Sequence, residues 1–287
     1  MYAHWKKLLF ICLTCLLQVH QVYAEQPSEP AKRIIALAPH IVELLFEVGA
    51  GEQIVGTTQH ADYPREALDI PRVGNYARLN IEQVLASDPD LIIAWKSGNP
   101  SDDIARLKQL GLNIVYSQPN TLEEVASELK YFARLTGHKE QGEQKAAQFL
   151  SRLRQLQAQY QDKQPISGFL ELWSRPLTTV AKDSWIQQQL DVCRVNNPFV
   201  DSATDYPQIN VEQVVLAAPE VIIQPSSHGM KAPETIDWQQ WPMIPAVKSG
   251  AFIHPNADKL HRMTSRALDE LTLLCQHIEH YRTKKLN

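Results

Sequence analysis

Two glutamates, Glu82 and Glu212, occupy the same place in a phrase that the chain contains twice. The first copy is Tyr76-Ala-Arg-Leu-Asn-Ile-Glu-Gln-Val84, and the second is Tyr206-Pro-Gln-Ile-Asn-Val-Glu-Gln-Val214, 130 residues further along. Two equivalent carboxylates can bind a two-fold symmetric partner that presents cations. Alternatively, each carboxylate only complements the dipole of the short helix that begins in its own copy. The residues alone favour neither explanation.

Four aromatic residues are placed where a large, flat ligand can bind. Tyr76 and Tyr206 open the two copies and fall in expected loops, whereas Trp95 ends one expected strand and Trp173 follows another. Ligands of open parallel sheets bind at the loops beyond the strands, and Tyr and Trp offer a broad surface with a polar edge. We expect these residues to line a binding site, with core packing of any one of them as the alternative.

No catalytic or nucleotide-binding motif is present. Gly49-Ala-Gly51 lacks the third glycine of a dinucleotide loop, and neither a phosphate loop nor a Gly-x-Ser-x-Gly turn occurs. The histidines have no Cys or acidic neighbours at metal-ligand spacing, so no metal site is expected. Only His40 and His60, beyond expected strand ends, are candidates for a cleft. A binding protein is therefore expected, and an exported enzyme is the alternative from another class.

Short apolar runs alternate with helical patterns along the chain, which predicts an α/β fold with parallel sheets flanked by helices. The repeated phrase indicates two similar Rossmann-like lobes with a ligand cleft between them. We expect an N-terminal lobe at 25–138 and a C-terminal lobe at 164–287. The expected strands lie at 33–37, 54–57, 91–95, 113–116, 168–172 and 221–224, and the longer expected helices at 41–48, 102–110, 122–135, 184–192 and 264–280.

The segment 139–163 is expected to be one long helix that links the lobes. It lacks proline over Lys139 to Gln161 and carries an apolar stripe at helical spacing. At 1.5 Å per residue it would extend roughly 30 to 35 Å, about the width of a small domain. A single helix resists bending, so little closure on binding is expected. An ordinary surface helix of one lobe is the alternative.

Residues 1–24 are expected to be a cleaved secretory signal peptide. Lys6 and Lys7 precede the apolar run Leu8 to Leu17, which is too short to span a bilayer, and Val22-Tyr-Ala24 offers a small-residue cleavage site. Without these two lysines, 26 of the 28 basic residues remain beside 32 acidic ones. This mild acidity argues against nucleic acid as a partner. We expect a soluble exported protein.

The number of cysteines is also consistent with an exported protein. Cys193 and Cys275 are the only cysteines outside the expected signal peptide, an even pair in an oxidising compartment. A disulfide between them is the expected state, and it would close a loop worth roughly 4 to 5 kcal/mol in the chain-entropy model. Two buried free thiols are the alternative.

Taken together, these residues resemble those of the periplasmic binding proteins of ATP-binding-cassette importers, in the class whose two α/β lobes are joined by one long helix. Within this class the chain is most similar to the cobalamin-binding members. The similarity covers essentially the whole mature chain. It rests on Asp62-Tyr-Pro64, Leu79-Asn-Ile-Glu82, Pro89-Asp-Leu-Ile-Ile-Ala-Trp95 with Gly98-Asn99, Leu190-Asp-Val-Cys193 and Pro207-Gln-Ile-Asn-Val-Glu-Gln213, together with Cys193 and Cys275.

The resemblance implies a monomeric, non-enzymatic receptor in the periplasm that binds cobalamin as its transported ligand and has no resident cofactor. It implies delivery to a dimeric inner-membrane permease with ATPase subunits, and Glu82 and Glu212 match the glutamates with which this family docks onto permease arginines. Trp95 matches a tryptophan of the cleft, and Asp258 matches an acidic residue that touches the amide side chains of the corrin ring. Arg262 matches a residue of the same loop.

Several positions depart from the family pattern. Tyr76 and Tyr206 stand where relatives carry tryptophan, and His60 replaces a tyrosine of the site. Thr178 replaces a phenylalanine, whereas Trp173 stands at a glycine position and adds surface for stacking. His261, beside Arg262, also departs from the pattern, and we include it among the ligand-binding candidates. The same fold serves haem and ferric-siderophore receptors, which are the alternative, with His60 or Tyr76 as an iron ligand.

Overall fold

The computed structural model describes residues 29–226 and 235–284. The expected signal peptide lies outside the described residues. Ala31–Asn287 forms one compact unit. No helix in the described ranges combines the length and the apolar character that crossing a membrane requires.

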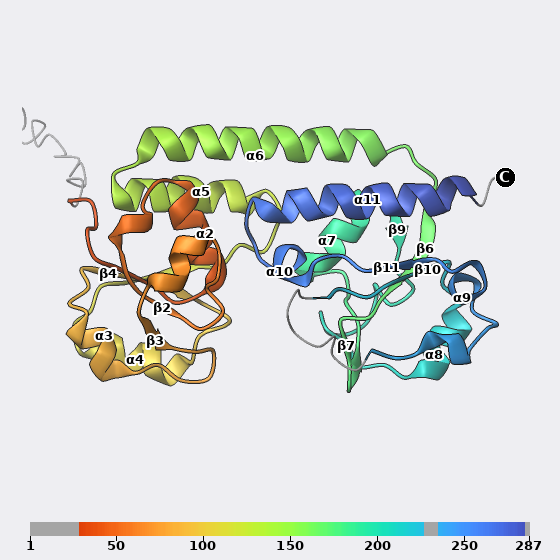
Figure 1. Cartoon of the computed structure of the whole chain (residues 1–287), viewed down its shortest axis with the longest axis horizontal. Helices are drawn as coiled ribbons and strands as arrows, with labels where there is room; N and C mark the ends of the chain where they lie inside the picture. Colours follow the sequence, from red (N-terminus) through yellow and green to blue (C-terminus); the bar gives the residue numbers. More distant parts are fainter. Residues whose placement is uncertain (1–28, 227–234, 285–287) are drawn as a thin grey trace, which may run out of the picture. The chain divides into compact units, whose positions relative to one another are not determined.

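The first sheet has five parallel strands in the order β3-β2-β1-β4-β5. The order reverses between β1 and β4, so the sheet is doubly wound. Four helices connect these strands or follow them (Figure 1). The strands are β1 (Ile34–Ala36), β2 (Ile54–Thr58), β3 (Arg72–Gly74), β4 (Leu91–Trp95) and β5 (Ile114–Ser117), and the helices are α2 (Pro39–Glu47), α3 (Ile81–Ala86), α4 (Ser101–Gln109) and α5 (Glu124–Thr136).

Side chains of β1 alternate between the two faces of this sheet. Ile34 and Ala36 belong to one buried cluster, to which α2 and α5 contribute, whereas Ile35 and Leu37 belong to a second cluster with α3 and α4. Helices therefore cover both faces, as is usual for a parallel sheet. Two short 3-10 helices, Gly51–Gln53 and Arg65–Asp69, precede β2 and β3.

The second sheet has four parallel strands in the order β11-β10-β6-β9, and its order reverses between β6 and β10. The fold of two α/β lobes, predicted from the alternation and the repeat, is confirmed. The strands are β6 (Ile166–Leu170), β9 (Val195–Asn196), β10 (Val221–Ile223) and β11 (Phe252–Ile253), and the helices are α7 (Trp185–Val192), α8 (Val211–Ala217), a 3-10 turn at Trp238–Gln240, α9 (Pro245–Ser249), α10 (Ala257–Leu260) and α11 (Arg266–Lys284).

The linking helix α6 (Lys139–Tyr160) is one continuous helix, which confirms the helix predicted from Lys139 to about Gln161. It packs against α5 and α11, which belong to different lobes (Figure 1). A Cβ atom on Gly142 would lie 2.2 Å from the Cβ of Ala133 in α5, so only glycine allows these helices to approach so closely. The residue ranges assigned to the lobes and the linker stay a prediction.

Cys193, which follows α7, and Cys275, within α11, form a disulfide across 82 residues, and both are fully buried. The expected pairing is confirmed. The bond fastens α7 to α11, so the closing helix of the chain is attached covalently to the C-terminal lobe.

The two copies of the repeated phrase begin helices α3 and α8, but their caps differ. Asn210 and Gln213 form a complete capping box, with both bonds at 2.9 Å. In the first copy Asn80 accepts a hydrogen bond from the Gln83 N–H at 3.1 Å, but the Asn80 N–H donates to the carbonyl of Val73. The first copy therefore has only half of a capping box, because the Asn80 N–H that the Gln83 side chain would need donates to Val73 of β3.

Candidate functional site

The carboxyl ends of β1 and β4 meet where the strand order of the first sheet reverses. Trp95 is the last residue of β4, and His40 lies in the first turn of α2. Their rings meet edge to face, with centroids 5.3 Å apart and planes at 81°. Ligands of doubly wound sheets bind at this switch point. The structure therefore places the predicted ligand residue Trp95 where the fold is suited to bind a ligand.

The backbone around Trp95 is held tightly. Asn99 Oδ1 accepts a hydrogen bond from the Trp95 N–H at 2.7 Å, and Asn99 Nδ2 donates to the carbonyl of Leu37 at 2.8 Å. A Cβ on Gly98 would lie 1.9 Å from Cε3 of the indole, so only glycine fits beneath the ring. Among the described residues, the buried indole Nε1 has no hydrogen-bond partner. The Gly98-Asn99 pair thus positions the tryptophan that precedes it.

A polar chain lies behind Trp95. Ser117 Oγ donates to Glu128 Oε2 at 2.7 Å, and His40 Nε2 lies 3.1 Å from the same hydroxyl oxygen. Because the hydroxyl proton points to the carboxylate, His40 donates rather than accepts. Burial, with a contribution from the charge of Arg262, lowers the pKa of His40 to about 3. A histidine that donates to a serine cannot activate it as a nucleophile. These hydrogen bonds therefore support the Trp95 ring and do not indicate catalysis.

The switch point of the second sheet is organised around a buried carboxylate. Glu171 follows β6 and is 4% exposed. It accepts hydrogen bonds from Ser174 Oγ (2.6 Å), Trp238 Nε1 (2.7 Å), Gln224 Nε2 (2.8 Å) and the Ile236 N–H (3.1 Å). A buried carboxylate without such donors would be costly. Glu171 therefore fixes the chain on both sides of the second switch point.

Trp173 and Tyr206 lie on neighbouring segments of the C-terminal lobe. Trp173 belongs to β7 (Trp173–Ser174), which pairs antiparallel with β8 (Leu177–Thr178). Thr178 pairs with Trp173 on one side and bridges to Gln208 on the other. Trp173 is 64% exposed and Tyr206 is 50% exposed, so both offer free aromatic surface.

Tyr76 lies in a tight turn of the N-terminal lobe and is 78% exposed. Gly74 and Leu79 bridge the ends of the turn, and Asn75 Oδ1 accepts hydrogen bonds from two following backbone N–H groups at 2.8 and 3.0 Å. In the described part of the chain, no ring contact joins Tyr76, Trp173 or Tyr206 to another aromatic ring. Their facing each other across a cleft stays a prediction.

Arg262, between α10 and α11, contacts two other predicted site residues, His60 and Asp258. Its Nη1 donates to Asp62 Oδ1 (2.6 Å) and Glu43 Oε1 (2.9 Å). Its Nη2 donates to the His60 carbonyl (3.1 Å) and lies 3.8 Å from Asp258 Oδ1. Burial alone would lower the pKa of Arg262, but the carboxylates of Asp62 and Glu43 raise it above its usual value. The guanidinium is thus charged and engaged by its own chain.

His261 ends α10 beside Arg262. Burial lowers its pKa to about 4, an effect that Asp258 opposes, so the ring is neutral near pH 7. Its Nε2 is buried and has no hydrogen-bond partner in the described ranges. A contact of His261 with a ligand stays a prediction.

Glu82 and Glu212 lie in the first turns of α3 and α8, and both are exposed. Leu85 and Leu216, on the same two helices, are exposed as well, at 43% and 84%. Each glutamate therefore lies on a surface that is available to a partner. This agrees with docking but equally with the helix-dipole explanation.

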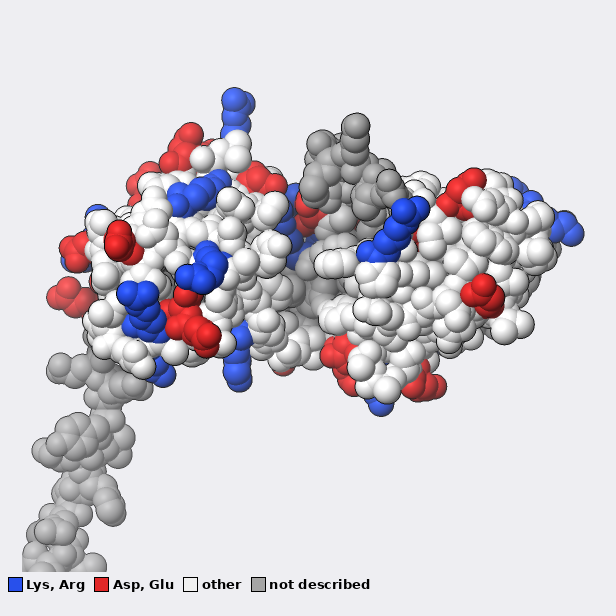
Figure 2. Space-filling view, turned by 90° about the horizontal axis from the view of Figure 1, so that it is seen from below, with Lys and Arg blue, Asp and Glu red and all other residues white. Residues whose placement is uncertain are grey.

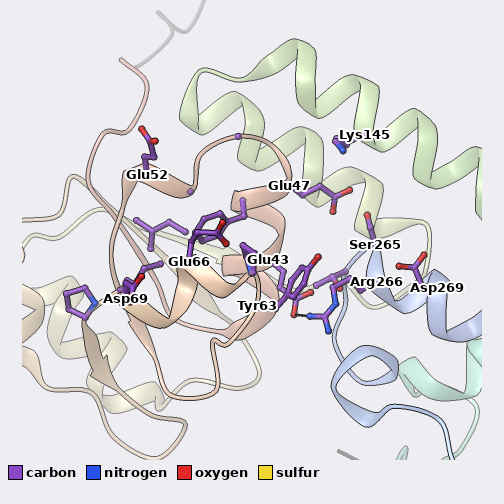
Figure 3. A pocket seen from close by; sticks show the side chains of 18 of the residues that line it. Glu43, Glu47, Glu52, Tyr63, Glu66, Asp69, Lys145, Ser265, Arg266 and Asp269 are labelled. Atoms are coloured by element: carbon purple, nitrogen blue, oxygen red, sulfur yellow. Dashed lines mark hydrogen bonds and ion pairs between the residues drawn. The ribbon is translucent and has the colours of Figure 1, made fainter. Parts of the chain in front are cut away.

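A cavity of about 880 Å³ lies elsewhere, beside α2, α6 and the start of α11 (Figure 3). None of the eight predicted ligand-binding residues lines it. Its wall includes Glu52, Ile54 and Pro71, which precede or begin β2 and β3, so it opens at the amino ends of strands. Ligands of such sheets bind at the carboxyl ends, and we therefore place the site at the switch points.

The shape of the molecular surface also supports placing the site at the switch points. Figure 2 shows a hollow between the two lobes, on the face opposite α6. Within the described residues, no group of three or more His, Cys, Asp or Glu side chains could hold a metal ion. The arrangement offers exposed aromatic faces from both lobes and polar groups near Arg262, which is suited to recognition of a large ligand.

The sequence did not point to three residues that organise the site. Glu43, Glu171 and Ser117 act through buried hydrogen bonds, and nothing in their local sequence distinguishes them from other polar residues. Asp62 belongs to the motif Asp62-Tyr-Pro64, which supported the family resemblance without a role for the aspartate.

The family follows from comparison with known proteins. A family model described as periplasmic binding protein matches residues 34–258. The chain belongs to this family of solute-binding proteins. Two α/β lobes with the strand ends of both sheets at the candidate site agree with that assignment.

The similarity extends to particular relatives. The chain is 38% identical over 251 residues to a protein of Vibrio cholerae serotype O1 named vitamin B12-binding protein, covering 87% of this chain and 90% of the relative. The crystal structure of periplasmic vitamin B12 binding protein BtuF of Vibrio cholerae matches with a TM-score of 0.81 and 37% identity, covering 88% of this chain and 98% of that one.

A structure of the periplasmic heme-binding protein RhuT from Roseiflexus sp. RS-1 has a TM-score of 0.77 at 21% identity, covering 88% of this chain and 99% of that one. At this identity the likeness concerns the fold alone.

Proposed function

We propose that this protein captures cobalamin between its two lobes in the periplasm and delivers it to an inner-membrane ATP-binding-cassette importer. The observation that carries the proposal is the similarity to vitamin B12-binding proteins, at 38% identity over 87% of the chain. The protein acts as a receptor and not as an enzyme, and cobalamin is its cargo rather than a resident cofactor. A cleaved signal peptide at residues 1–24 directs its export.

The geometry supports a large ring-shaped ligand. Trp95 lies at the first switch point, and Trp173 and Tyr206 lie on neighbouring segments of the other lobe. Tyr76 is the most exposed of these four aromatic residues, at 78%. Aromatic faces from two lobes can cover a corrin ring from both sides, while Asp258, His60 and Arg262 meet its amide-rich edge.

Docking is assigned to the two equivalent glutamates. Glu82 and Glu212 are exposed on the first turns of short helices in different lobes, as a two-fold symmetric pair of permease subunits requires. A monomeric receptor can present both carboxylates to such a dimer at once. Permease arginines are the expected partners, because a carboxylate and a guanidinium form bidentate pairs.

Calorimetric titration of the processed protein with cyanocobalamin, haemin and a ferric siderophore tests the ligand assignment. We expect saturable binding of one cobalamin per chain and much weaker binding of the other two ligands. Tight haemin or siderophore binding without cobalamin binding would reject the proposal.

Haem or a ferric siderophore is the alternative ligand, because His60 and Tyr76 are exposed and can ligate iron. It is the weaker candidate, since the haem-binding likeness has 21% sequence identity against 37% for the vitamin B12-binding structure. An absorption shift typical of histidine- or tyrosinate-bound iron would favour it.

A further inference from the structure

Two arginines of the C-terminal lobe form ion pairs with two carboxylates of the N-terminal lobe. Glu43 comes from α2 and Asp62 from the loop after β2, whereas Arg262 and Arg266 lie at the start of α11 or just before it. We name these four residues the clasp. They connect the lobes in addition to α6, which joins them through the backbone, and to Gln188 of α7, which bonds the backbone of Asn120 and Leu122.

Glu43 is the centre of the clasp, and its side chain is 3% exposed. Its Oε1 accepts from Nη1 of both Arg262 and Arg266, each at 2.9 Å. The guanidinium of Arg266 also stacks on the ring of Tyr63, 3.8 Å from its centre (Figure 3). Tyr63 follows Asp62, so the loop after β2 is held through an ion pair and through a cation–π contact.

Three of the four charged side chains of the clasp are shielded from solvent. Arg262 and Arg266 are 12% and 19% exposed, although Asp62 is 50% exposed. Burial alone would raise the pKa of Asp62, but its hydrogen bond with Arg262 lowers that pKa below the usual value. Buried pairs are screened little by salt, and removing one partner leaves an uncompensated charge. The arrangement therefore resists separation of the lobes at this edge.

The clasp connects directly to the loops of the candidate cleft. Arg262 binds the carbonyl of His60 and lies beside Asp258, so one guanidinium touches the loop after β2 and the helix after β11. Both segments follow the carboxyl ends of parallel strands. The position of one segment relative to the other is thus set through Arg262.

We propose that Glu43 and Asp62 are positioning residues for ligand binding, which hold Arg262 so that the two lobes present a cleft of fixed width. The inference rests on the proposed function, because that function assigns these loops to ligand contact. Neither carboxylate needs to touch the ligand. If opening of the clasp leaves only about one molecule in ten in the competent arrangement, apparent affinity falls about tenfold.

The test compares Asp62→Ala with a matched control. Asp62 is half exposed, so its replacement is compatible with folding, whereas Glu43→Gln is the more severe second variant. Arg152→Gln removes a different ion pair, between Arg152 and Asp269 at 2.6 Å, which joins α6 to α11 and includes none of the four clasp residues. We expect cobalamin affinity to fall about tenfold in Asp62→Ala and to change less than about twofold in Arg152→Gln.

A double-mutant cycle separates positioning from general stability. In an Arg262→Gln background, Asp62→Ala should weaken binding by less than about twofold, because both changes break the same link. Equal effects of Asp62→Ala in both backgrounds would overturn the positioning role. A lower melting temperature with unchanged affinity would overturn it as well.

The distance between the lobes can be measured in the ligand-free protein with spin labels attached to Gln109→Cys and Lys248→Cys, at two exposed positions. We expect one narrow distance distribution in the otherwise unaltered protein and in Arg152→Gln, and a broader one in Asp62→Ala. If the protein binds no cobalamin, the proposed function fails. The spin-label distances then still test the role of the clasp. Unchanged distances in Asp62→Ala would show that the clasp does not set the separation of the lobes.

Discussion

The two lobes use the same phrase in different surroundings. In the C-terminal copy, Asn210 and Gln213 cap each other, and the bond to a strand is made one residue earlier, where the Ile209 N–H donates to Leu177 of β8. In the N-terminal copy, β3 accepts the backbone donor of Asn80, so α3 is attached to its sheet. The repeat therefore specifies where each glutamate lies in its helix, whereas the neighbouring strand decides how the helix is anchored.

The switch points differ in a similar way. The N-terminal lobe places an indole against His40, with an asparagine and a glycine holding Trp95 from behind. The C-terminal lobe places the buried carboxylate of Glu171 there, and its exposed rings are Trp173 on the β7–β8 hairpin and Tyr206 on the neighbouring segment. The first switch point thus holds a half-buried, constrained ring, whereas the second holds a buried carboxylate. Equivalent folds therefore organise their switch points through different local contacts.

The largest expected effect concerns the equivalence of the two glutamates. Charge reversal at both, Glu82→Lys with Glu212→Lys, should reduce cobalamin uptake by roughly 100-fold or more, because like charges at an interface cost several kcal/mol. Ligand affinity should be unchanged, since neither residue is among the proposed ligand contacts. Transport into cells and titration of the purified variant give the two readouts.

If the two copies are equivalent, Glu82→Lys alone and Glu212→Lys alone should reduce cobalamin uptake by similar factors. Full uptake by the double variant with normal ligand binding would leave only the helix-dipole role for these carboxylates.

The histidines of the two lobes predict a pH dependence of stability. The pKa values of His40 and His261 are lowered to about 3 and about 4, so the folded state stays neutral while the unfolded state binds a proton below about pH 6.5. Stability contributed by each neutral ring is present above that pH and is lost as the pH falls toward the folded value. Going from pH 7 to pH 5 should cost about 2 kcal/mol per histidine.

Urea unfolding of His261→Asn across this pH range measures the effect. The variant should lose less stability between pH 7 and pH 5 than the unaltered protein, by about 2 kcal/mol. Parallel curves for the two proteins would contradict the buried neutral state.

The tryptophans of the two lobes should respond differently to truncation. Trp173→Ala should weaken cobalamin binding about tenfold with little change in melting temperature, because the ring is 64% exposed and is proposed to contact the ligand. Trp95→Ala should weaken binding and also lower the melting temperature, because the indole packs on His40. Titration and thermal unfolding of both variants provide the comparison. A lower melting temperature in Trp173→Ala but not in Trp95→Ala would contradict the expected difference between the two tryptophans.

The smallest effect concerns the helix caps. Gln213→Ala should destabilise the protein by about 0.5 to 1 kcal/mol, since it removes the bond to the Asn210 N–H. Gln83→Ala should be close to neutral, because the corresponding donor is taken by Val73. Equal losses in urea unfolding would show that the two caps are equivalent after all.

Local patterns predicted much of this fold. Every strand and helix expected from periodicity is present, as are the linking helix and the disulfide. The missed strands β3, β7, β8, β9 and β11 have two or three residues each, too few to show a period. Trp173 was expected just beyond a strand and instead lies in a short strand of its own.

The contacts that organise the site were beyond local patterns. Arg262 and Glu43 are 219 residues apart, and Glu171 and Trp238 are 67 residues apart. Such pairs depend on how the two sheets pack, which no window of sequence contains. The same applies to Asn80, whose cap depends on a strand too short to predict.

Hydrogen–deuterium exchange with and without cyanocobalamin tests most directly whether the ligand lies at the switch points of both lobes. Protection is expected at 74–79 and 95–99 in the N-terminal lobe and at 172–178 and 205–209 in the C-terminal lobe. The segments 46–54 and 65–71, which border the 880 Å³ cavity, should exchange unchanged. Protection confined to those cavity segments, or to a single lobe, would contradict this account.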